Sequence, residues 1–569
     1  MKIKGLLFGL FACAALAACT NEDIVDNNGN GEQEKVKANV TFVIGASTNS
    51  SRATTDEDSD TKVDGTTVEN SVSNALIVLQ NKETKKEYAF PLGSSDLQPT
   101  SAGTEIVYKP SIKVQEAGTY NAIVILNPCT AIKNAGETFA SSSDGTLPAG
   151  ASSLTDYIKT YEISGDITSG IAKANNFMMV NPEAKELTIT SNQETTVQTE
   201  NINVERVASK ISYRPLKTGN LYEVTVNTEG YTVNEVDGWV IRGGVATHMT
   251  GMWCGTYNGE DIFVHTAAGD TQKFYESTGR KYLDTEELEY TEKMGVDISK
   301  IVWKTSKNAQ STEQSWYIKL TRYALVNLSN RVYAVRHIMG SDNKVTTFGL
   351  LDGSNYIVDP YTEAKNAKET NFTTYFFNVG TAVADDFDTY AKRLPDGTDE
   401  DNDETDNDEY GKCLSYCYEN GVMADNQTTD YVTGIIFEGK FTKADGTELG
   451  ATIYGYKKGN DEKETYYYNY EDICADNEID MATAVAKASV YESGSCYYYS
   501  KDITHNENGN MKHAIMRNNI YSLQVNGFTA IGSATVEFPT QGDETDKNFY
   551  LKLTSKILPW KVRFNNITF

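Results

Sequence analysis

The stretch VKANVTFVIG, residues 36–45, alternates apolar with polar side chains close to the start of the chain, apart from Val43. A period of two puts every second side chain on one face, as a half-buried β-strand requires. Five apolar residues share the face that we predict to be buried: Val36, Ala38, Val40, Phe42 and Ile44. The stretch therefore predicts a strand that belongs to a hydrophobic core.

A lipoprotein signal precedes this strand. The sequence MKIKGLLFGLFACAALAAC joins two lysines to a short apolar run and ends in small residues before Cys19. The run is too short to span a bilayer, which is typical of an export signal. We predict a signal over residues 1–18, lipidation of Cys19, and a disordered polar tether over residues 19–35. An ordinary signal peptide that happens to contain a cysteine is the alternative.

A single arginine follows the strand. The stretch ASTNSSRATTDEDSD, residues 46–60, contains Arg52, and the next arginine of the chain is Arg206. Small, hydroxyl and acidic residues of this kind favour a disordered loop, which a protease can cut without unfolding the protein. A cut between Arg52 and Ala53 would release the strand, over residues 36–52, together with the lipid anchor.

The overall composition favours β structure outside the cell. The chain has 569 residues, a formal net charge of -28, 35 tyrosines and only 11 prolines. Abundant aromatic and β-branched residues between Gly, Asn and Asp turns indicate a mostly β protein with a few short helices. The strongly acidic balance excludes a nucleic-acid binder that relies on phosphate contacts.

Motifs for catalysis or cofactor binding are missing from the sequence. The five histidines have no metal-binding spacing, and no nucleotide-binding loop or nucleophile elbow occurs. The acidic stretch 396–412 lacks the spacing of an EF-hand, so a solvated loop is favoured over a Ca²⁺ site. We therefore predict no enzyme, no cofactor and no metal, with one or two optional disulfides among the cysteines of the mature chain: Cys129, Cys254, Cys413, Cys417, Cys474 and Cys496.

The chain closes on a second amphipathic stretch, LPWKVRFNNITF, residues 558–569. Pro559 predicts a break in the preceding strand, because proline cannot donate within a central ladder. After it, every second residue is apolar, first at even and then at odd positions: Trp560, Val562, Phe564, Ile567 and Phe569. The switch between the two series predicts a bulge near Asn565 and Asn566. This strand can pair within its own domain or fill a groove in a neighbour.

Further stretches, together with the signal, the Arg52 loop and the closing strand, resemble the type V pilins. These are the fimbrillins of anaerobic Gram-negative bacteria, and the chain looks most similar to the branch of minor-fimbrium major subunits. The stretches are YNAIVILNP (120–128), NNFMMVNPEA (175–184), NVERVASKISYRP (203–215) and AIMRNNIYSLQVNGFTAIG (514–532). The resemblance implies two transthyretin-like β-sandwich domains with inserted loops, over residues 53–205 and 206–569. It also implies a cut after Arg52 by an Arg-specific protease, and a donor strand over about 556–569 that replaces the first strand of a neighbour.

The function implied by the resemblance is that of a fimbrial stalk subunit. Such a subunit reaches the outer membrane as a lipoprotein, polymerises with copies of itself, joins anchor and tip subunits, and supports adhesion through surface receptors. Two alternatives stay open: a tip or accessory adhesin of the same family, and a surface glycan-binding lipoprotein or glycosidase in which tyrosines form sugar platforms. The alternating C-terminus argues against the tip, which needs no donor strand, and the isolated Arg52 argues against an anchor, which keeps its first strand.

Overall fold

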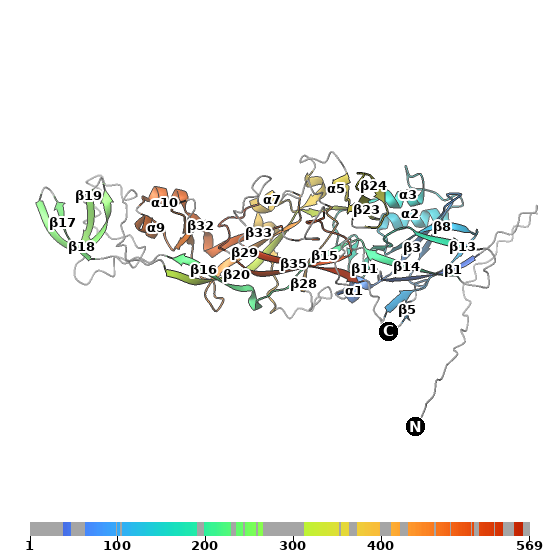
Figure 1. Ribbon diagram of the computed structural model, residues 1–569, viewed down its shortest axis with the longest axis horizontal. Coiled ribbons are helices and arrows are strands. Elements are labelled where there is room, and N and C mark those ends of the chain that lie inside the picture. The colour runs from blue at the N-terminus through green and yellow to red at the C-terminus, as the bar shows by residue number, and fades with distance from the viewer. Residues whose placement is uncertain are drawn as a thin grey trace, which may run out of the picture.

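The fold is taken from a computed structural model of the chain, shown in Figure 1. The model describes residues 38–46, 63–97, 99–102, 105–190, 198–228, 235–242, 245–257, 260–265, 312–351, 354–363, 372–398, 411–421, 431–459, 463–477, 479–501, 503, 505, 511–528, 530–538 and 551–561.

The first half of the chain builds one large sheet, in the order β4-β3-β8-β12-β14-β1-β6-β5, with β13 beside β8 and β7 beside β1. Its central strands are rich in Ala, Ile, Val and Leu and are almost wholly buried. The strands are β1 (Ala38–Ala46), β3 (Ala75–Asn81), β4 (Glu87–Leu92), β5 (Pro99–Ala102), β6 (Glu105–Tyr108), β7 (Ser111–Val114), β8 (Gly118–Leu126), β12 (Met179–Val180), β13 (Lys185–Ile189) and β14 (Gln198–Arg206).

Two helices, α2 (Thr130–Ser141) and α3 (Leu154–Thr160), lie over this sheet (Figure 1). The close fit of α2 depends on a glycine: a Cβ at Gly136 would lie 2.5 Å from a methyl group of Leu76 in β3. Such a distance is too short for two carbon atoms, so only glycine lets the helix come this near to the strand.

The chain after Arg206, together with β2, forms two main sheets. One has the order β2-β35-β34-β15-β28, and the other runs β32-β30-β31-β16-β20-β29-β33, with β27 beside β20. The first contains β2 (Val63–Asp64), β35 (Leu551–Lys561), β34 (Asn519–Phe528), β15 (Ser209–Tyr213) and β28 (Lys412–Cys417). The second contains β32 (Ser489–Tyr491), β30 (Ile453–Tyr456), β31 (Thr465–Tyr467), β16 (Leu221–Thr228), β20 (Thr312–Val326), β29 (Gly434–Thr442), β33 (Ser495–Ser500) and β27 (Lys392–Arg393).

Shorter elements connect and cover these sheets. The small strands are β9 (Glu162–Ser164), β10 (Ala172–Lys173), β11 (Asn176–Phe177), β21 (Leu328–Ser329), β22 (Arg331–Tyr333), β23 (His337–Met339), β24 (Val345–Thr347), β25 (Tyr356–Ile357) and β26 (Phe376–Phe377). A separate three-stranded sheet holds β17 (Glu235–Arg242), β18 (Val245–Tyr257) and β19 (Glu260–His265). The remaining described α-helices are α1 (Thr67–Asn70), α5 (Pro360–Glu363), α6 (Phe372–Tyr375), α7 (Gly380–Asp385), α8 (Phe387–Tyr390), α9 (Tyr470–Asn477) and α10 (Met481–Lys487). The prediction of a mostly β protein with a few short helices is confirmed.

The apolar side chains gather in two large clusters. The first is made mainly by residues of the N-terminal sheet, and the second by residues from Ile211 to Ile531. The chain passes from one sheet to the other between β14, which ends at Arg206, and β15, which begins at Ser209. The division into domains at residues 205 and 206 stays a prediction, and this change of sheet lies beside it.

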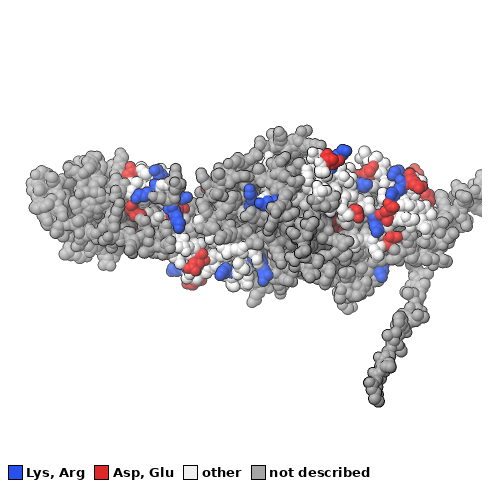
Figure 2. Space-filling model, in the orientation of Figure 1, with Lys and Arg blue, Asp and Glu red and all other residues white. Residues whose placement is uncertain are grey.

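Charged side chains of both signs lie interspersed on the face drawn in Figure 2, as far as the described residues show. No helix among the described residues is long and apolar enough to cross a membrane.

Candidate functional site

The predicted first strand lies inside the N-terminal sheet. On one side, Val40–Ala46 of β1 pairs in parallel with Gln198–Val204 of β14. On the other side, β1 runs antiparallel to β7, from Ala38 opposite Val114 to Thr41 opposite Ser111, and meets β6 where Ile44 lies opposite Tyr108. A strand with partners on both sides leaves a gap in the sheet when it is taken away.

The buried face of β1 is the one that the sequence predicts. Val40, Phe42 and Ile44 have no exposed surface and belong to the first apolar cluster. Between them, Thr41 points to the opposite face, where its hydroxyl lies 2.6 Å from the hydroxyl of Ser111. Burial of each large apolar side chain stabilises the fold by roughly 1.5–3 kcal/mol. Val36 lies outside the described residues, and Ala38 begins β1.

Removal of β1 would uncover polar groups as well as apolar ones. The backbone N–H of Phe42 donates to the carbonyl oxygen of Pro110 at 3.0 Å, and β14 and β7 pair with β1 through their own backbones. Neighbouring strands lie about 4.8 Å apart, so β14 and β7 would flank a slot about 9.6 Å wide. Because buried N–H and C=O groups require partners, the slot has the shape and the unmet hydrogen bonds to receive another strand.

The C-terminal strand, β35, has fewer described pairing partners than β1. β35 pairs antiparallel with β34 from Leu551 opposite Phe528 to Pro559 opposite Asn519. On its other side, among the described residues, it pairs only with the two residues of β2, where Val63 lies opposite Trp560. The prediction that Pro559 breaks the strand is wrong, since β35 continues to Lys561. Because so little of the second side of β35 is paired, a residue without an N–H can be tolerated there.

Several predicted site residues fall outside the described part of the chain. These are the lipidation site, the processing site and most of the predicted donor strand: Cys19, Arg52, Ala53, Val562, Phe564, Ile567 and Phe569. Trp560 lies within β35, next to β2.

Helix α1, the first described helix after the predicted processing site, is held by buried charges. Glu69 is 1 % exposed, and one of its carboxylate oxygens accepts hydrogen bonds from Lys210 Nζ at 2.8 Å and from the hydroxyl of Tyr416 at 2.7 Å. Burial alone would raise the pKa of Glu69, but the charges of Lys210 and Arg206 and these hydrogen bonds outweigh it and lower the pKa. The carboxylate is therefore ionised, and the residues that bind it, Lys210 and Tyr416, lie after the predicted processing site.

Two more buried ion pairs extend this group between the two sheets. Arg336 pairs with Glu205, while Arg517 Nη2 lies 2.6 Å from a carboxylate oxygen of Glu419, and all four side chains are at most 3 % exposed. Sequence reasoning missed this set. The signal was present in the stretches 203–215 and 514–532, which carry Glu205 and Arg517 beside apolar residues.

The described cysteines form no disulfide. The expected disulfides are not formed among five of them: Cys129, Cys413, Cys417, Cys474 and Cys496. Cys413 and Cys417 lie on the same strand, β28, which keeps their side chains apart. The described residues contain no group of His, Cys, Asp and Glu side chains that could hold a metal ion. Residues 399–410 of the acidic stretch lie outside the described part.

Residues 489–566 match the family model for the C-terminal part of fimbrillin, described as major fimbrial subunit protein type IV. The matched segment contains β33, β34 and β35. It therefore includes the part of the predicted donor strand that the structure describes, which ends at Lys561. The C-terminal part of the chain is therefore similar to that of fimbrillins. This match supports a role as a fimbrial subunit at the cell surface.

Solved structures resemble the chain over almost its whole length at low sequence identity. A fimbrilin from Porphyromonas gingivalis is 12% identical, covers 93% of this chain and 99% of its own, and has a TM-score of 0.38. A candidate cell adhesion protein from Parabacteroides distasonis is also 12% identical, covers 93% of this chain and 98% of its own, and has a TM-score of 0.39. Among curated protein sequences, none matches the chain.

Proposed function

We propose that this chain is a fimbrial stalk subunit that is exported as a lipoprotein with Cys19 acylated, cut between Arg52 and Ala53, and polymerised by strand exchange. In this mechanism an Arg-specific protease releases β1, and the C-terminal strand of a neighbouring subunit takes its place. Anchor and tip subunits complete the fimbrium, while the acyl group on Cys19 holds the precursor at the outer membrane.

The position of β1 carries the proposal. It is an interior strand with three fully buried apolar side chains, yet it stands at the start of the described chain and is joined to the rest only through the segment that contains Arg52. One cut in that segment separates β1 from every later element without breaking any other part of the backbone. The product is a sheet that has lost an interior strand and needs a replacement.

The closing segment has the pattern that the slot requires. Trp560, Val562 and Phe564 have the same spacing as the three buried residues of β1. In the closing segment, the two residues between them, Lys561 and Arg563, are basic. A strand inserted in the direction of β1 would place these three apolar side chains in the core and pair with β14 on one side and β7 on the other. A subunit that lacks such a segment could receive a neighbour but could not extend the polymer, so the segment supports a stalk rather than a tip role.

The test uses fimbriae detached from the cell surface. N-terminal sequencing of the assembled subunit should give Ala53 as the first residue. The variant Arg52→Ala should accumulate as a lipidated, monomeric precursor, whereas Lys62→Ala, the next basic residue along the segment, should mature and assemble normally. Assembled subunits that begin at Cys19, or normal fimbriae from Arg52→Ala, would contradict the proposal.

A further inference from the structure

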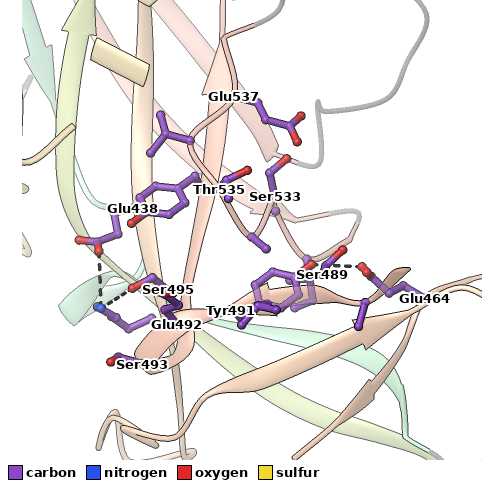
Figure 3. A pocket seen from close by; sticks show the side chains of 18 of the residues that line it. Glu438, Glu464, Ser489, Tyr491, Glu492, Ser493, Ser495, Ser533, Thr535 and Glu537 are labelled. Carbon is purple, nitrogen blue, oxygen red and sulfur yellow. Dashed lines mark hydrogen bonds and ion pairs between the residues drawn. The ribbon is translucent and has the colours of Figure 1, made fainter. Parts of the chain in front are cut away.

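A large cavity lies in the second half of the chain, far from β1. It has a volume of about 970 Å³, and its floor is formed by the neighbouring strands β20, β29 and β33. Figure 3 shows Ser533, Thr535 and Glu537 on one side of it and Ser489, Tyr491 and Glu464 on the other. This volume is near the upper end of small-molecule sites, which span roughly 300–1,000 Å³.

Side chains from the three floor strands line up across the sheet. Arg322 of β20 lies opposite Glu438 of β29, which in turn lies opposite Tyr497 of β33. Arg322 Nε donates to a carboxylate oxygen of Glu438 at 2.5 Å, and Arg322 Nη1 donates to Asp388 at 2.7 Å. In the next row, Lys440 donates to the hydroxyl of Ser495. Because the row stands on paired strands, its geometry is set before any ligand arrives.

The charges of the lining nearly cancel, with five carboxylates and four basic side chains. Burial alone would raise the pKa of Glu438, but the hydrogen bond and charge of Arg322, with the charge of Lys440, lower it. Glu438 is therefore an ionised acceptor that is already paired. A lining of this kind does not favour a phosphate or a polyanion, which needs an excess of basic groups.

Hydroxyl groups make up most of the remaining polar lining. They belong to Ser489, Ser493, Ser495, Ser533, Thr535, Tyr491 and Tyr497. A hydroxyl can both donate and accept a hydrogen bond, and the carboxylates beside them accept while the lysines donate. Few large apolar side chains are present, unlike in the grooves that receive amphipathic helices. The ligand that matches is neutral and carries many groups that donate and accept at once.

Tyr497 supplies an aromatic surface within this polar lining. Its neighbours along β33, Cys496 and Tyr498, have no exposed surface and point into the second apolar cluster. By the period of two, Tyr497 points to the opposite face, where it stays partly exposed and packs edge-on against Phe387 at 5.4 Å between ring centroids. A tyrosine ring held in this way offers a flat apolar face with a polar end.

We propose that this cavity binds a neutral oligosaccharide, with the C–H face of one sugar ring on Tyr497 and its hydroxyls paired to the carboxylates, lysines and hydroxyls around it. A pyranose ring has a face of C–H groups, which can stack on the ring of Tyr497. It also has a rim of hydroxyls, which can pair with the polar groups of the lining. Sugar binding at this cavity does not depend on strand exchange. Its repetition along the length of the fimbrium rests on the proposed stalk role.

The experiment titrates the purified full chain with four neutral pentasaccharides (maltopentaose, xylopentaose, mannopentaose and chitopentaose) and with a sulfated heparin pentasaccharide. At least one neutral sugar should bind with a dissociation constant below about 1 mM. Tyr497→Ala should weaken that binding by about tenfold or more, while Tyr497→Phe should keep most of it. Tyr468→Ala is the matched control, because Tyr468 is 56% exposed and lies outside the cavity lining.

Circular dichroism and thermal unfolding of each variant separate a lost contact from a lost fold, and Tyr497→Ala should still be cut and assembled into fimbriae. The proposal is overturned when no neutral pentasaccharide binds at about 10 mM, when only the sulfated sugar binds, or when Tyr497→Ala and the unchanged chain bind alike. A β-strand peptide that binds in the cavity along β32, with no sugar binding, would also overturn it.

Discussion

β1 and β35 are the first and last described strands of the chain, and they differ in how many partners hold them. Among the described residues, β1 pairs on both sides along most of its length, whereas β35 pairs along one side with β34 and meets β2 at only two residues on the other. The first strand is thus built into its sheet, and the last strand is held mainly from one side.

This difference suits the two strands to opposite roles in the proposed exchange. When a strand that is paired on both sides leaves, the hydrophobic core beneath it and the backbone groups of both neighbouring strands become exposed. A strand of matching pattern can cover both. A strand held mainly on one side can separate more readily and be supplied to a neighbour. The same protein would then hold both an acceptor, made by proteolysis, and a donor, made by its own C-terminus.

The largest expected effect follows from deletion of residues 560–569. The shortened subunits should still be lipidated and cut after Arg52, because neither step requires the C-terminus, but they should remain monomers. Electrophoresis without boiling, followed by N-terminal sequencing of the monomer, measures both outcomes. Long SDS-resistant polymers of the shortened chain would show that the C-terminal segment is not the donor.

A smaller change separates the two faces of the donor segment. Val562→Asp would bury an unpaired carboxylate in the slot of the neighbour, at a cost of several kcal/mol, and should abolish polymers. Lys561→Asp places the same charge on the outward face and should leave assembly largely intact. The yield of polymer from the two variants measures the effect. Equal yields would contradict the assignment of Val562 to the buried face and Lys561 to the outward face.

If β1 is removed as proposed, its side chains should matter only before the cut. Phe42→Ala leaves a cavity in the precursor and should lower its free energy of unfolding by about 3 kcal/mol, as found for large buried aromatic residues. Fimbriae assembled from this variant should be as stable as those of the unchanged chain, because the altered strand is no longer present. Urea unfolding of the precursor and heat dissociation of the fimbriae provide the two measurements.

The smallest expected effect concerns Glu69 of α1, which remains in the protein after the proposed cut. Since the pKa of Glu69 is lowered in the folded protein, its ionised form stabilises the fold above the pKa of the unfolded chain. That contribution is lost as the pH falls through the folded-state pKa. Glu69→Gln should therefore lower stability at neutral pH and reduce the loss of stability on acidification. Urea midpoints measured from pH 7 down to pH 3 check this, and parallel curves for both proteins would contradict it.

The sequence predicts local features of this fold better than long-range ones. The alternation from Val36 to Ile44 identifies the buried face of β1, because a period of two leaves only one apolar face. It does not reveal that β14, far along the chain, is the parallel partner of β1, because register depends on contacts between distant segments. The rule that proline ends a central strand failed at Pro559, where the strand has little pairing on one side.

The polar features depend still more on distant contacts. Glu69, Arg206, Lys210 and Tyr416 come together from three segments that are far apart in the chain. The local spacing within each segment does not reveal which charged residues will meet. The cavity that contains Tyr497 also draws on separate strands, and its tyrosine stands in a run, SCYYYS, whose other members are buried.

The most direct test of strand exchange is a disulfide between two subunits. Thr41 of β1 lies opposite Ser111 of β7, and a donor that follows the register of β1 places Lys561 or, two residues on, Arg563 at the position of Thr41. Opposed residues of an antiparallel pair have Cα atoms about 4.5–5.5 Å apart, within reach of a disulfide. Fimbriae that carry Ser111→Cys with Lys561→Cys or Arg563→Cys should give a ladder of covalent multimers under non-reducing conditions, and each single variant should not. Fimbriae that assemble fully with both double variants and yet show no covalent dimer would contradict the account.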